Sequence, residues 1–305
     1  MDFTTFSRSL DSYRDEQSTY QGLALFTGGK DSTYLLYLLS KLKDFRVLAL
    51  TIDNWFISEN TWRNINRVLR ALSVDYMIFR PSWNIVRDLY KMSVLKRGTL
   101  CTVCEALVTV GTYGIAMKLN IPAIFWGLAP SQFRTQPHWI IHTDFEYWKK
   151  IYKRYLEGLG EVAGFNTKAY QDFLRSYLPP IDKSSSLPHH VFPYLALGYD
   201  LGTIERTIQK LGWEYPRDVV GLGTNCTANH LHYYLRSRAC GEKFEALIQR
   251  KTREGMVSPA IANRILQEDF SEEAAVDVLD SIGLYITPSA LLSQLPEGAI
   301  DCFDA

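Results

Sequence analysis

The sequence has no excess of charge of either sign, no long apolar run and few cysteines. Its 33 basic and 33 acidic residues give a formal net charge of zero at pH 7, so the overall composition indicates neither a nucleic acid nor an anionic membrane as partner. No apolar run approaches the roughly 18 residues that a membrane-spanning helix needs. The first residues resemble neither a signal peptide nor a transit peptide. We therefore expect a cytoplasmic protein that has no membrane partner.

The five cysteines are too few for a disulfide framework in a chain of 305 residues. Metal binding or thiol chemistry is therefore the better interpretation of any close pair. Hydrophobic residues make up 47% of the chain, which is enough to bury one large core or two smaller ones. The composition thus predicts a folded globular protein.

One short stretch near the N-terminus predicts a phosphate-binding loop. Residues 23–26 form an apolar run typical of a buried strand, and residues 34–39 continue an apolar run at helical length. Between them lie two glycines, which let the backbone turn tightly and bring its N–H groups close to an anion. Asp31 or Ser32 could cap the helix that follows. A helix N-terminus at this point favours phosphate or pyrophosphate.

The segments that follow predict an α/β fold with a doubly wound parallel sheet. Apolar runs and amphipathic periodicity predict strands at 45–53, 74–79 and 123–126, and helices at 60–72, 85–96 and 106–119. This alternation implies right-handed crossovers. Asp53 and Gly127 follow two of the strands, so both lie at the edge of the sheet where ligands bind. Asp53 could bind the nucleotide or its magnesium, or it could be a helix cap or a loop aspartate.

Three of the cysteines lie in patterns typical of a site. Cys101 and Cys104 form a Cys-x-x-Cys pair in a loop or in the first turn of an apolar helix, where the helix N-terminus would stabilise thiolates. The pair has three interpretations: ligands of a metal or cluster, a redox dithiol or sulfur carrier, and two buried apolar side chains. Cys226 lies in a polar run just before another helix and is a candidate third ligand. Cys240 and Cys302 have no such neighbours, and we expect neither to take part in the chemistry.

The phosphate loop, Thr27-Gly-Gly-Lys-Asp-Ser32, resembles the Ser-Gly-Gly-x-Asp-Ser loop of the N-type ATP pyrophosphatases, also called the PP-loop or adenine nucleotide alpha hydrolase-like superfamily. The hydroxyl of Thr27 replaces that of the usual serine. The resemblance implies a HUP-like core that binds ATP and Mg²⁺ and splits ATP between its α and β phosphates. It implies nucleotide-binding roles for Thr27, Gly28, Gly29, Lys30, Asp31 and Ser32, and we add Asp53 and Gly127 at the same edge of the sheet.

The order of the loop and the three cysteines is similar to that of the cluster-dependent tRNA thiolation enzymes of the superfamily. That resemblance implies that Cys101, Cys104 and Cys226 ligate a [4Fe–4S] cluster with one open iron. The rival is Zn²⁺, with His230 or His232 as a fourth ligand. The run from Leu235 to Ala262, which includes Lys251, resembles the end of the N-acetyl sugar amidotransferase group, whose members use ATP and ammonia from a separate glutaminase.

The two resemblances leave three functions open. The leading hypothesis is a sulfurtransferase: a substrate oxygen is adenylated with release of pyrophosphate, aided by Lys30 and Asp31, and is then replaced by sulfur from a cluster or from a persulfide on Cys101, Cys104 or Cys226. The alternatives are an ammonia-dependent amidotransferase or ligase, and a non-catalytic nucleotide-binding protein stabilised by zinc. The substrate is a small molecule or sugar, with tRNA still open, and the partner is a sulfur donor or a glutaminase.

We expect two parts in the chain. Residues 1–140 would form the nucleotide-binding α/β domain, and residues 141–305 a mostly helical substrate region packed on it. Residues 145–199 could shape a substrate pocket through their aromatic and basic side chains. The aromatic-rich helical half could also supply the face of a homodimer.

Overall fold

The computed structural model describes residues 1–14, 18–133, 135, 137–151, 153, 154, 172, 176, 177, 181–268 and 270–302. Much of the 145–199 segment predicted to shape a substrate pocket therefore lies outside the described residues. Within the described ranges, no helix combines the length and the apolar character that crossing a membrane requires.

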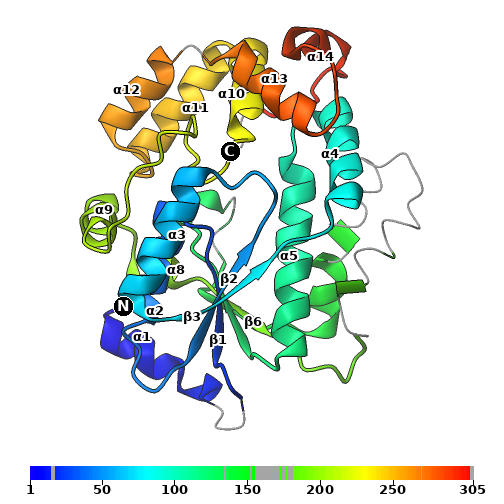
Figure 1. Ribbon diagram of the computed structural model, residues 1–305. Helices are drawn as coiled ribbons and strands as arrows, with labels where there is room; N and C mark the ends of the chain where they lie inside the picture. The colour runs from blue at the N-terminus through cyan, green and yellow to red at the C-terminus, as the bar shows by residue number, and fades with distance from the viewer. Residues whose placement is uncertain are drawn as a thin grey trace.

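A mostly parallel sheet forms the centre of the molecule (Figure 1). Across the described residues it has six strands in the order β3-β2-β1-β4-β6-β5, and only β5 runs antiparallel to its neighbour. The strands are β1 (Gly22–Leu25), β2 (Val47–Ile52), β3 (Asp75–Phe79), β4 (Ala123–Phe125), β5 (Ile140–Ile141) and β6 (His189–Val191). The chain proceeds outward from β1 to β2 and β3, then crosses back to β4 on the other side of β1. The predicted doubly wound α/β fold is confirmed.

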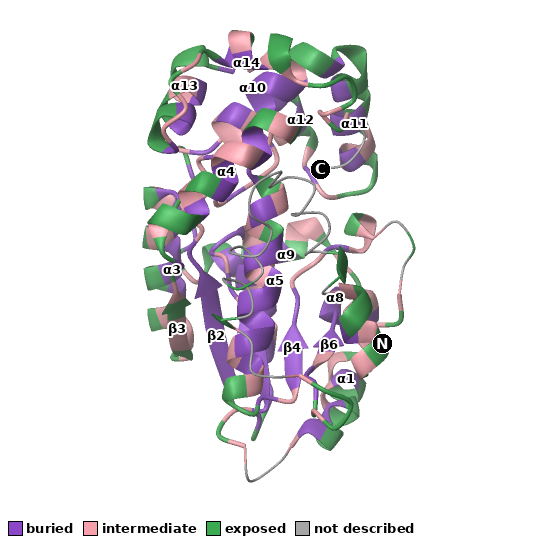
Figure 2. Cartoon of the chain, turned by 90° about the vertical axis from the view of Figure 1, so that its right-hand side faces the viewer, coloured by how far each residue is buried: buried purple, intermediate pink, exposed green. Residues whose placement is uncertain are grey.

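Helices cover both faces of the sheet because the strand side chains alternate between two cores. Ala24 and Ala49 pack with α1, α2, α3 and α9, whereas Leu23 and Leu50 pack with α5. Figure 1 shows α2 and α3 on one side of the sheet and α5 on the other. These helices are α1 (Phe3–Ser9), α2 (Lys30–Leu39), α3 (Glu59–Leu72), α5 (Cys101–Lys118) and α9 (Leu201–Gln209). Figure 2 shows the inner strands buried and β3 partly exposed at the edge.

A third core joins the end of the chain to the sheet domain. Helices α10 to α14 pack around buried residues that include Leu231 and Leu279, and the same cluster contains Val94 of α4 and Val103 of α5. The predicted helical C-terminal region is thus present. The helices of this region are α10 (Asn229–Cys240), α11 (Glu242–Arg253), α12 (Pro259–Gln267), α13 (Glu272–Ser281) and α14 (Pro288–Gln294), and they pack on α4 (Trp83–Arg97). The short elements are two 3₁₀ turns, η1 (Asp11–Tyr13) and η2 (Pro130–Gln132), and α8 (Pro193–Leu197).

Strand β6 lies well beyond residue 140, so the sheet takes in chain from both sides of the predicted domain boundary. The division at that residue stays a prediction.

Two cysteines outside the candidate site are joined to each other. Cys240, at the end of α10, and Cys302, near the C-terminus, form a disulfide across a sequence separation of 62. We expected neither to take part in the chemistry, and their neighbours in the sequence gave no sign of this bond. The disulfide depends on tertiary structure. The last described residues return to α10, where the carbonyl of Asp301 accepts hydrogen bonds from the buried guanidinium of Arg236.

Candidate active site

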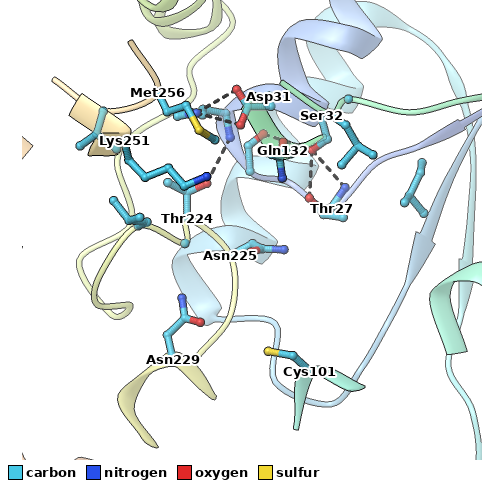
Figure 3. Close-up of a pocket in the computed structure, with 18 of the residues that line it drawn as sticks. Thr27, Asp31, Ser32, Cys101, Gln132, Thr224, Asn225, Asn229, Lys251 and Met256 are labelled. Carbon is cyan, nitrogen blue, oxygen red and sulfur yellow. Dashed lines mark hydrogen bonds and ion pairs between the residues drawn. The ribbon is translucent and has the colours of Figure 1, made fainter. Parts of the chain in front are cut away.

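A pocket of about 360 Å³ opens where the sheet reverses its strand order (Figure 3). In doubly wound sheets this reversal, beside the carboxyl ends of the strands, is where ligands bind. One wall follows β1 and β4, and the other comes from residues 222–257 of the helical region. The lining residues are Leu25, Thr27, Gly29, Lys30, Asp31, Ser32, Cys101, Trp126, Gly127, Leu128, Gln132, Leu222, Gly223, Thr224, Asn225, Asn229, His232, Tyr233, Lys251, Met256 and Val257.

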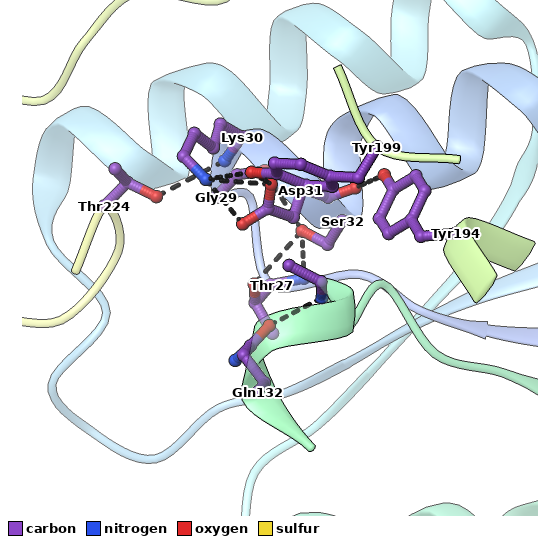
Figure 4. A network of polar contacts seen from close by, with 10 residues as sticks. Thr27, Gly29, Lys30, Asp31, Ser32, Gln132, Tyr194, Tyr199 and Thr224 are labelled. Atoms are coloured by element: carbon purple, nitrogen blue, oxygen red, sulfur yellow. Dashed lines mark hydrogen bonds and ion pairs between the residues drawn. The ribbon is translucent and has the colours of Figure 1, made fainter. Parts of the chain in front are cut away.

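The predicted phosphate loop connects β1 to α2. Gly29 is the N-cap and has no side chain to cap the helix, so neither Asp31 nor Ser32 caps it as we expected. The first N–H group of the helix, that of Lys30, donates to the Thr224 hydroxyl at 3.3 Å. The Ser32 hydroxyl instead accepts a bond from the Thr27 backbone N–H at 3.1 Å and donates to the Gly29 carbonyl at 3.1 Å, which closes the loop (Figure 4). Free N–H groups at a helix start form an anion site.

Two glycines are needed for this geometry. Gly28 has a φ of +73°, and a Cβ added there would lie 2.6 Å from Ile65 Cγ1. Gly127, just after β4, packs directly on the start of α2: an added Cβ would lie 3.2 Å from the Asp31 carbonyl oxygen and from two backbone atoms of Ser32. Gly127 therefore lets the chain after β4 pack against the start of α2.

Lys30 and Asp31 are held together by a tyrosine far away in the sequence (Figure 4). Lys30 Nζ donates to both carboxylate oxygens of Asp31, at 2.9 and 2.8 Å, and to the Tyr199 hydroxyl at 2.8 Å. The Tyr199 hydroxyl donates in turn to Asp31 Oδ1 at 2.8 Å. Burial and then the neighbouring Asp31 charge raise the pKa of Tyr199, so it stays neutral. In this arrangement the charges of Lys30 and Asp31 largely offset each other.

The opposite wall carries a lysine that the sequence did not single out for a role. Lys251, on α11, is only 4% exposed and extends into the pocket from the side opposite Thr27 and Ser32 (Figure 3). Beside it, the Thr224 hydroxyl accepts a bond from the Lys30 backbone N–H at 3.3 Å. The available signal was that Lys251 lies in the run that resembles the amidotransferase group, but nothing local showed that it is buried or what it faces.

The three predicted site cysteines are free thiols. Cys101 and Cys104 lie in the first turn of α5, and Cys226 pairs with Ile57 in an isolated β-bridge. The Asn54 amide donates to Cys104 Sγ at 3.4 Å and to Cys226 Sγ at 3.6 Å, so these two thiols flank one side chain. Cys101 lines the pocket that contains the phosphate loop.

Burial dominates the titration of these thiols. It raises the pKa of Cys101 and Cys104, and it raises the pKa of Cys226 to about 11. We expected stabilised thiolates, and the shift of the pKa is in the opposite direction. Cys101 is exposed as a residue, yet the pocket walls still desolvate its thiol.

A metal site is not preformed among the described residues: no group of three or more histidine, cysteine, aspartate or glutamate side chains is placed to hold an ion. The thiols have the right chemistry for a soft metal, but they do not form a ready ligand set for a cluster or for zinc. Of the two histidines considered as extra ligands, His232 lines the pocket, and burial lowers its pKa to about 4. His230 instead lies 3.4 Å from the Asp218 carbonyl oxygen.

Asp53 does not line the pocket. Its side chain is almost fully buried, at 1% residue exposure. One carboxylate oxygen accepts from the Trp55 N–H at 2.8 Å and the other from Arg80 Nε at 2.6 Å. These contacts agree with the alternative in which Asp53 organises its own loop.

Comparisons with known proteins give only partial matches. No family model matches the chain. Among curated proteins, the uncharacterized protein MJ1599 of Methanocaldococcus jannaschii is 25% identical over 114 residues, which is 37% of this chain and 40% of that protein. The chain thus spans well under half the length of this relative. An NH3-dependent NAD synthetase from Campylobacter jejuni, solved with a nitrate ion, matches 72% of this chain and all of its own chain at 15% identity, with a TM-score of 0.34. A score this low supports no conclusion about this chain.

Proposed function

We propose that this protein is an ATP-dependent enzyme of the PP-loop type, which adenylates a substrate oxygen and releases pyrophosphate. The observation that carries the proposal is the loop from Thr27 to Ser32: it joins β1 to the start of a helix whose N-cap is a glycine, at the switch point of the sheet and inside a pocket. Backbone N–H groups and the Lys30 ammonium would bind the phosphates there. The substrate oxygen would attack the α phosphorus as the bond to the β phosphate breaks.

Lys30 and Asp31 would change partners when the nucleotide binds. The phosphates offer Lys30 more negative charge than one carboxylate does, which would free Asp31. Asp31 lines the pocket and is the residue that would hold Mg²⁺, and the ion, when bound, would neutralise charge on the leaving pyrophosphate. Tyr199 would then keep both side chains at the helix start.

For the second step we propose sulfur transfer, because a thiol lies in the same pocket as the phosphate loop. Cys101 is the member of the thiol group that lines it. A persulfide delivered to Cys101 by a donor protein would attack the activated carbon through its outer sulfur as AMP leaves, which joins the substrate to Cys101 by an S–S bond. A second thiol, from a dithiol reductant, would attack the Cys101 sulfur and release the thiolated product, and the same reductant would reopen the resulting disulfide. Since the three thiols form no ready ligand set, we derive no step through a cluster or zinc. The substrate class stays open between small molecules, sugars and tRNA.

An ammonia-dependent ligase is the second candidate. The run from Leu235 that resembles the amidotransferase group contributes Lys251, Met256 and Val257 to the pocket wall. A role for this run at the active site would suit an enzyme of that kind, with ammonia from a separate glutaminase.

The test measures the products of ATP. Purified protein with Mg²⁺ and ATP is incubated with fractions of small metabolites or with tRNA, and AMP, ADP and pyrophosphate are quantified. We expect AMP and pyrophosphate in equal amounts. ADP and orthophosphate, or ATP binding without turnover in every fraction, would contradict an adenylating enzyme.

A second measurement identifies the nucleophile. With an active fraction, sulfide and ammonium are supplied in turn, and mass spectrometry shows whether the product gained sulfur or nitrogen. Sulfur transfer predicts that Cys101→Ala abolishes product formation from a persulfide donor and leaves ATP binding intact. Equal product formation by wild type and variant would favour the ligase.

A further inference from the structure

A second pocket, of about 450 Å³, is lined by the loop after β2, by the start of α4 and by α13. Trp55, Phe56 and Trp83 form its aromatic wall, and α13 contributes Asp277 and Val278. No described residue lines both this pocket and the one that contains the phosphate loop. It is therefore a separate cavity, which the proposed ATP chemistry does not use.

Two tryptophans make the aromatic wall a fixed and accessible surface. Trp55 is 39% exposed, and its φ of +71° is uncommon for a residue that has a side chain. Its indole N–H donates to the Pro81 carbonyl at 2.9 Å, and its ring centroid lies 5.3 Å from that of Trp83. A ligand could contact these rings without first having to order them.

The charge of this pocket is negative. If histidine is counted as neutral, Asp277 is the one charged residue among the described residues that line it. Within the described part of the chain, Asp277 has no ion-pair partner. Arg80 also contacts the aromatic wall, 4.8 Å from the Trp55 ring centroid, but its charge is paired with the Asp53 carboxylate through Nε at 2.6 Å. The pocket would thus repel a phosphate and attract a cation.

We propose that this pocket binds a small organic cation, a substituted ammonium or a guanidinium group, against the two tryptophans and beside Asp277. The electron-rich face of an indole attracts cations more strongly than that of any other aromatic side chain. A carboxylate in the same pocket adds Coulomb attraction. A neutral ring would also stack on the tryptophans, but it would gain nothing from Asp277, so the charge of the pocket favours the cation.

The proposed cation site lies next to the free thiols. Asn54, whose amide donates to Cys226 Sγ at 3.6 Å, directly precedes Trp55, and Thr227 of the pocket lining directly follows Cys226. The Thr227 N–H donates to the Phe56 carbonyl at 2.8 Å, which joins the two lining segments. A bound cation would therefore contact the same two segments that hold the Asn54 amide and the Cys226 thiol together.

The test is a titration of the full chain, labelled with fluorotryptophan and followed by fluorine NMR at about pH 8, where histidine is ordinarily neutral. Tryptophan-to-phenylalanine variants assign the signals of Trp55, Trp83 and Trp126. The probes are choline, agmatine and a neutral analogue of choline in which a carbon atom replaces the nitrogen. We expect both cations to shift the signals of Trp55 and Trp83, and choline to bind roughly 5-fold to 30-fold more tightly than its analogue. The signal of Trp126, which lines the phosphate-loop pocket, should not move.

Two substitutions test the contacts. Asp277→Asn removes the charge, and Trp83→Leu removes the ring but keeps an apolar side chain. Each should weaken choline binding roughly 3-fold to 10-fold and reduce the preference for choline over its neutral analogue. Asp280→Asn is the matched control, because Asp280 is exposed on the same helix and is not among the residues that line the pocket; it should bind choline as wild type does. Trp83→Phe replaces the leucine variant if thermal melting shows that the latter does not fold.

Three outcomes would overturn the proposal. The first is that neither cation binds wild type with a millimolar Kd or tighter. The second is equal binding of choline and its neutral analogue, which would show an apolar pocket with no preference for charge. The third is a shift of Trp126 without shifts of Trp55 and Trp83, which would place the cation in the other pocket. None of these results bears on ATP binding, so the proposed function is tested separately.

Discussion

His190 is a buried histidine that the fold holds in its neutral form. It lies on β6 at 5% exposure, next to Trp126 of the pocket wall. The indole N–H of Trp126 donates to His190 Nδ1 at 2.8 Å, and the Tyr113 hydroxyl bonds to Nε2. Because an indole only donates, Nδ1 must be an acceptor and the proton of the neutral ring belongs on Nε2. Protonating Nδ1 would leave two donors, this N–H and the indole N–H of Trp126, facing each other with no acceptor between them.

Burial, and then the nearby charge of His189, lower the pKa of His190 from 6.5 to about 4. The unfolded chain therefore binds this proton more readily than the folded protein does. The contribution of His190 to stability is complete above pH 6.5 and is lost as the pH falls towards 4. At pH 4.5 the difference in proton binding corresponds to about 2.5 kcal/mol of lost stability.

The assay is urea unfolding of wild type and His190→Gln at pH 7.5 and pH 4.5. Glutamine can still accept from Trp126 and donate to Tyr113, but it does not titrate. We expect the loss of unfolding free energy between the two pH values to be about 2.5 kcal/mol smaller in the variant. The pKa values of His189 and His232 are also lowered. Both residues are present in wild type and variant, so their contributions cancel in the comparison. The same loss in both proteins would refute the assignment of His190 as a buried neutral base.

Three further predictions concern the glycine contact, the buried carboxylate and the disulfide. Gly127→Ala places a methyl group 3.2 Å from the backbone of the phosphate loop, and calorimetry should show ATP binding weakened about 10-fold. Gly202→Ala should bind ATP normally, because its tightest contact is with the flexible end of Arg206 and its contact with Asp200 Oδ1, at 3.8 Å, is ordinary. Arg80→Met removes the ion-pair partner of the buried Asp53 carboxylate. The free energy of unfolding, measured in urea, should fall by about 2 kcal/mol, less than for a fully buried pair because Arg80 is half exposed. An unchanged urea midpoint would contradict this. Cys302→Ser removes the disulfide that joins Cys240 to Cys302 across a sequence separation of 62. The free energy of unfolding should fall by up to about 4 kcal/mol, and the variant should match wild type under reducing conditions.

The sequence was informative where structure depends on neighbouring residues. The strand, loop and helix around Thr27 follow from a local apolar pattern and two glycines, and the structure has them where they were predicted. The position of Cys101 in the first turn of α5 was likewise among the alternatives that local pattern allowed.

Features that depend on distant contacts could not be predicted in this way. Tyr199 bonds to Lys30 across a sequence separation of 169. Lys251 lines the pocket because of the tertiary packing of α11, which contacts α10. The high pKa of the Cys104 thiol is a property of the surrounding walls, not of the Cys-x-x-Cys pair itself. The partner of Asp53, Arg80, follows the neighbouring strand, so its role depended on strand order as well as on residue type.

The core shared by α4, α5 and the C-terminal helices limits how this protein can be divided. Val103 and Leu107 of α5 pack in the same cluster as Leu231 of α10, and the pocket draws its walls from both parts. A fragment that ended before α10 would expose this apolar surface to water and would lack the pocket wall that His232, Lys251 and Met256 help to form. The helical region therefore cannot be exchanged as a module: any replacement would have to rebuild both the packing on α5 and one wall of the site.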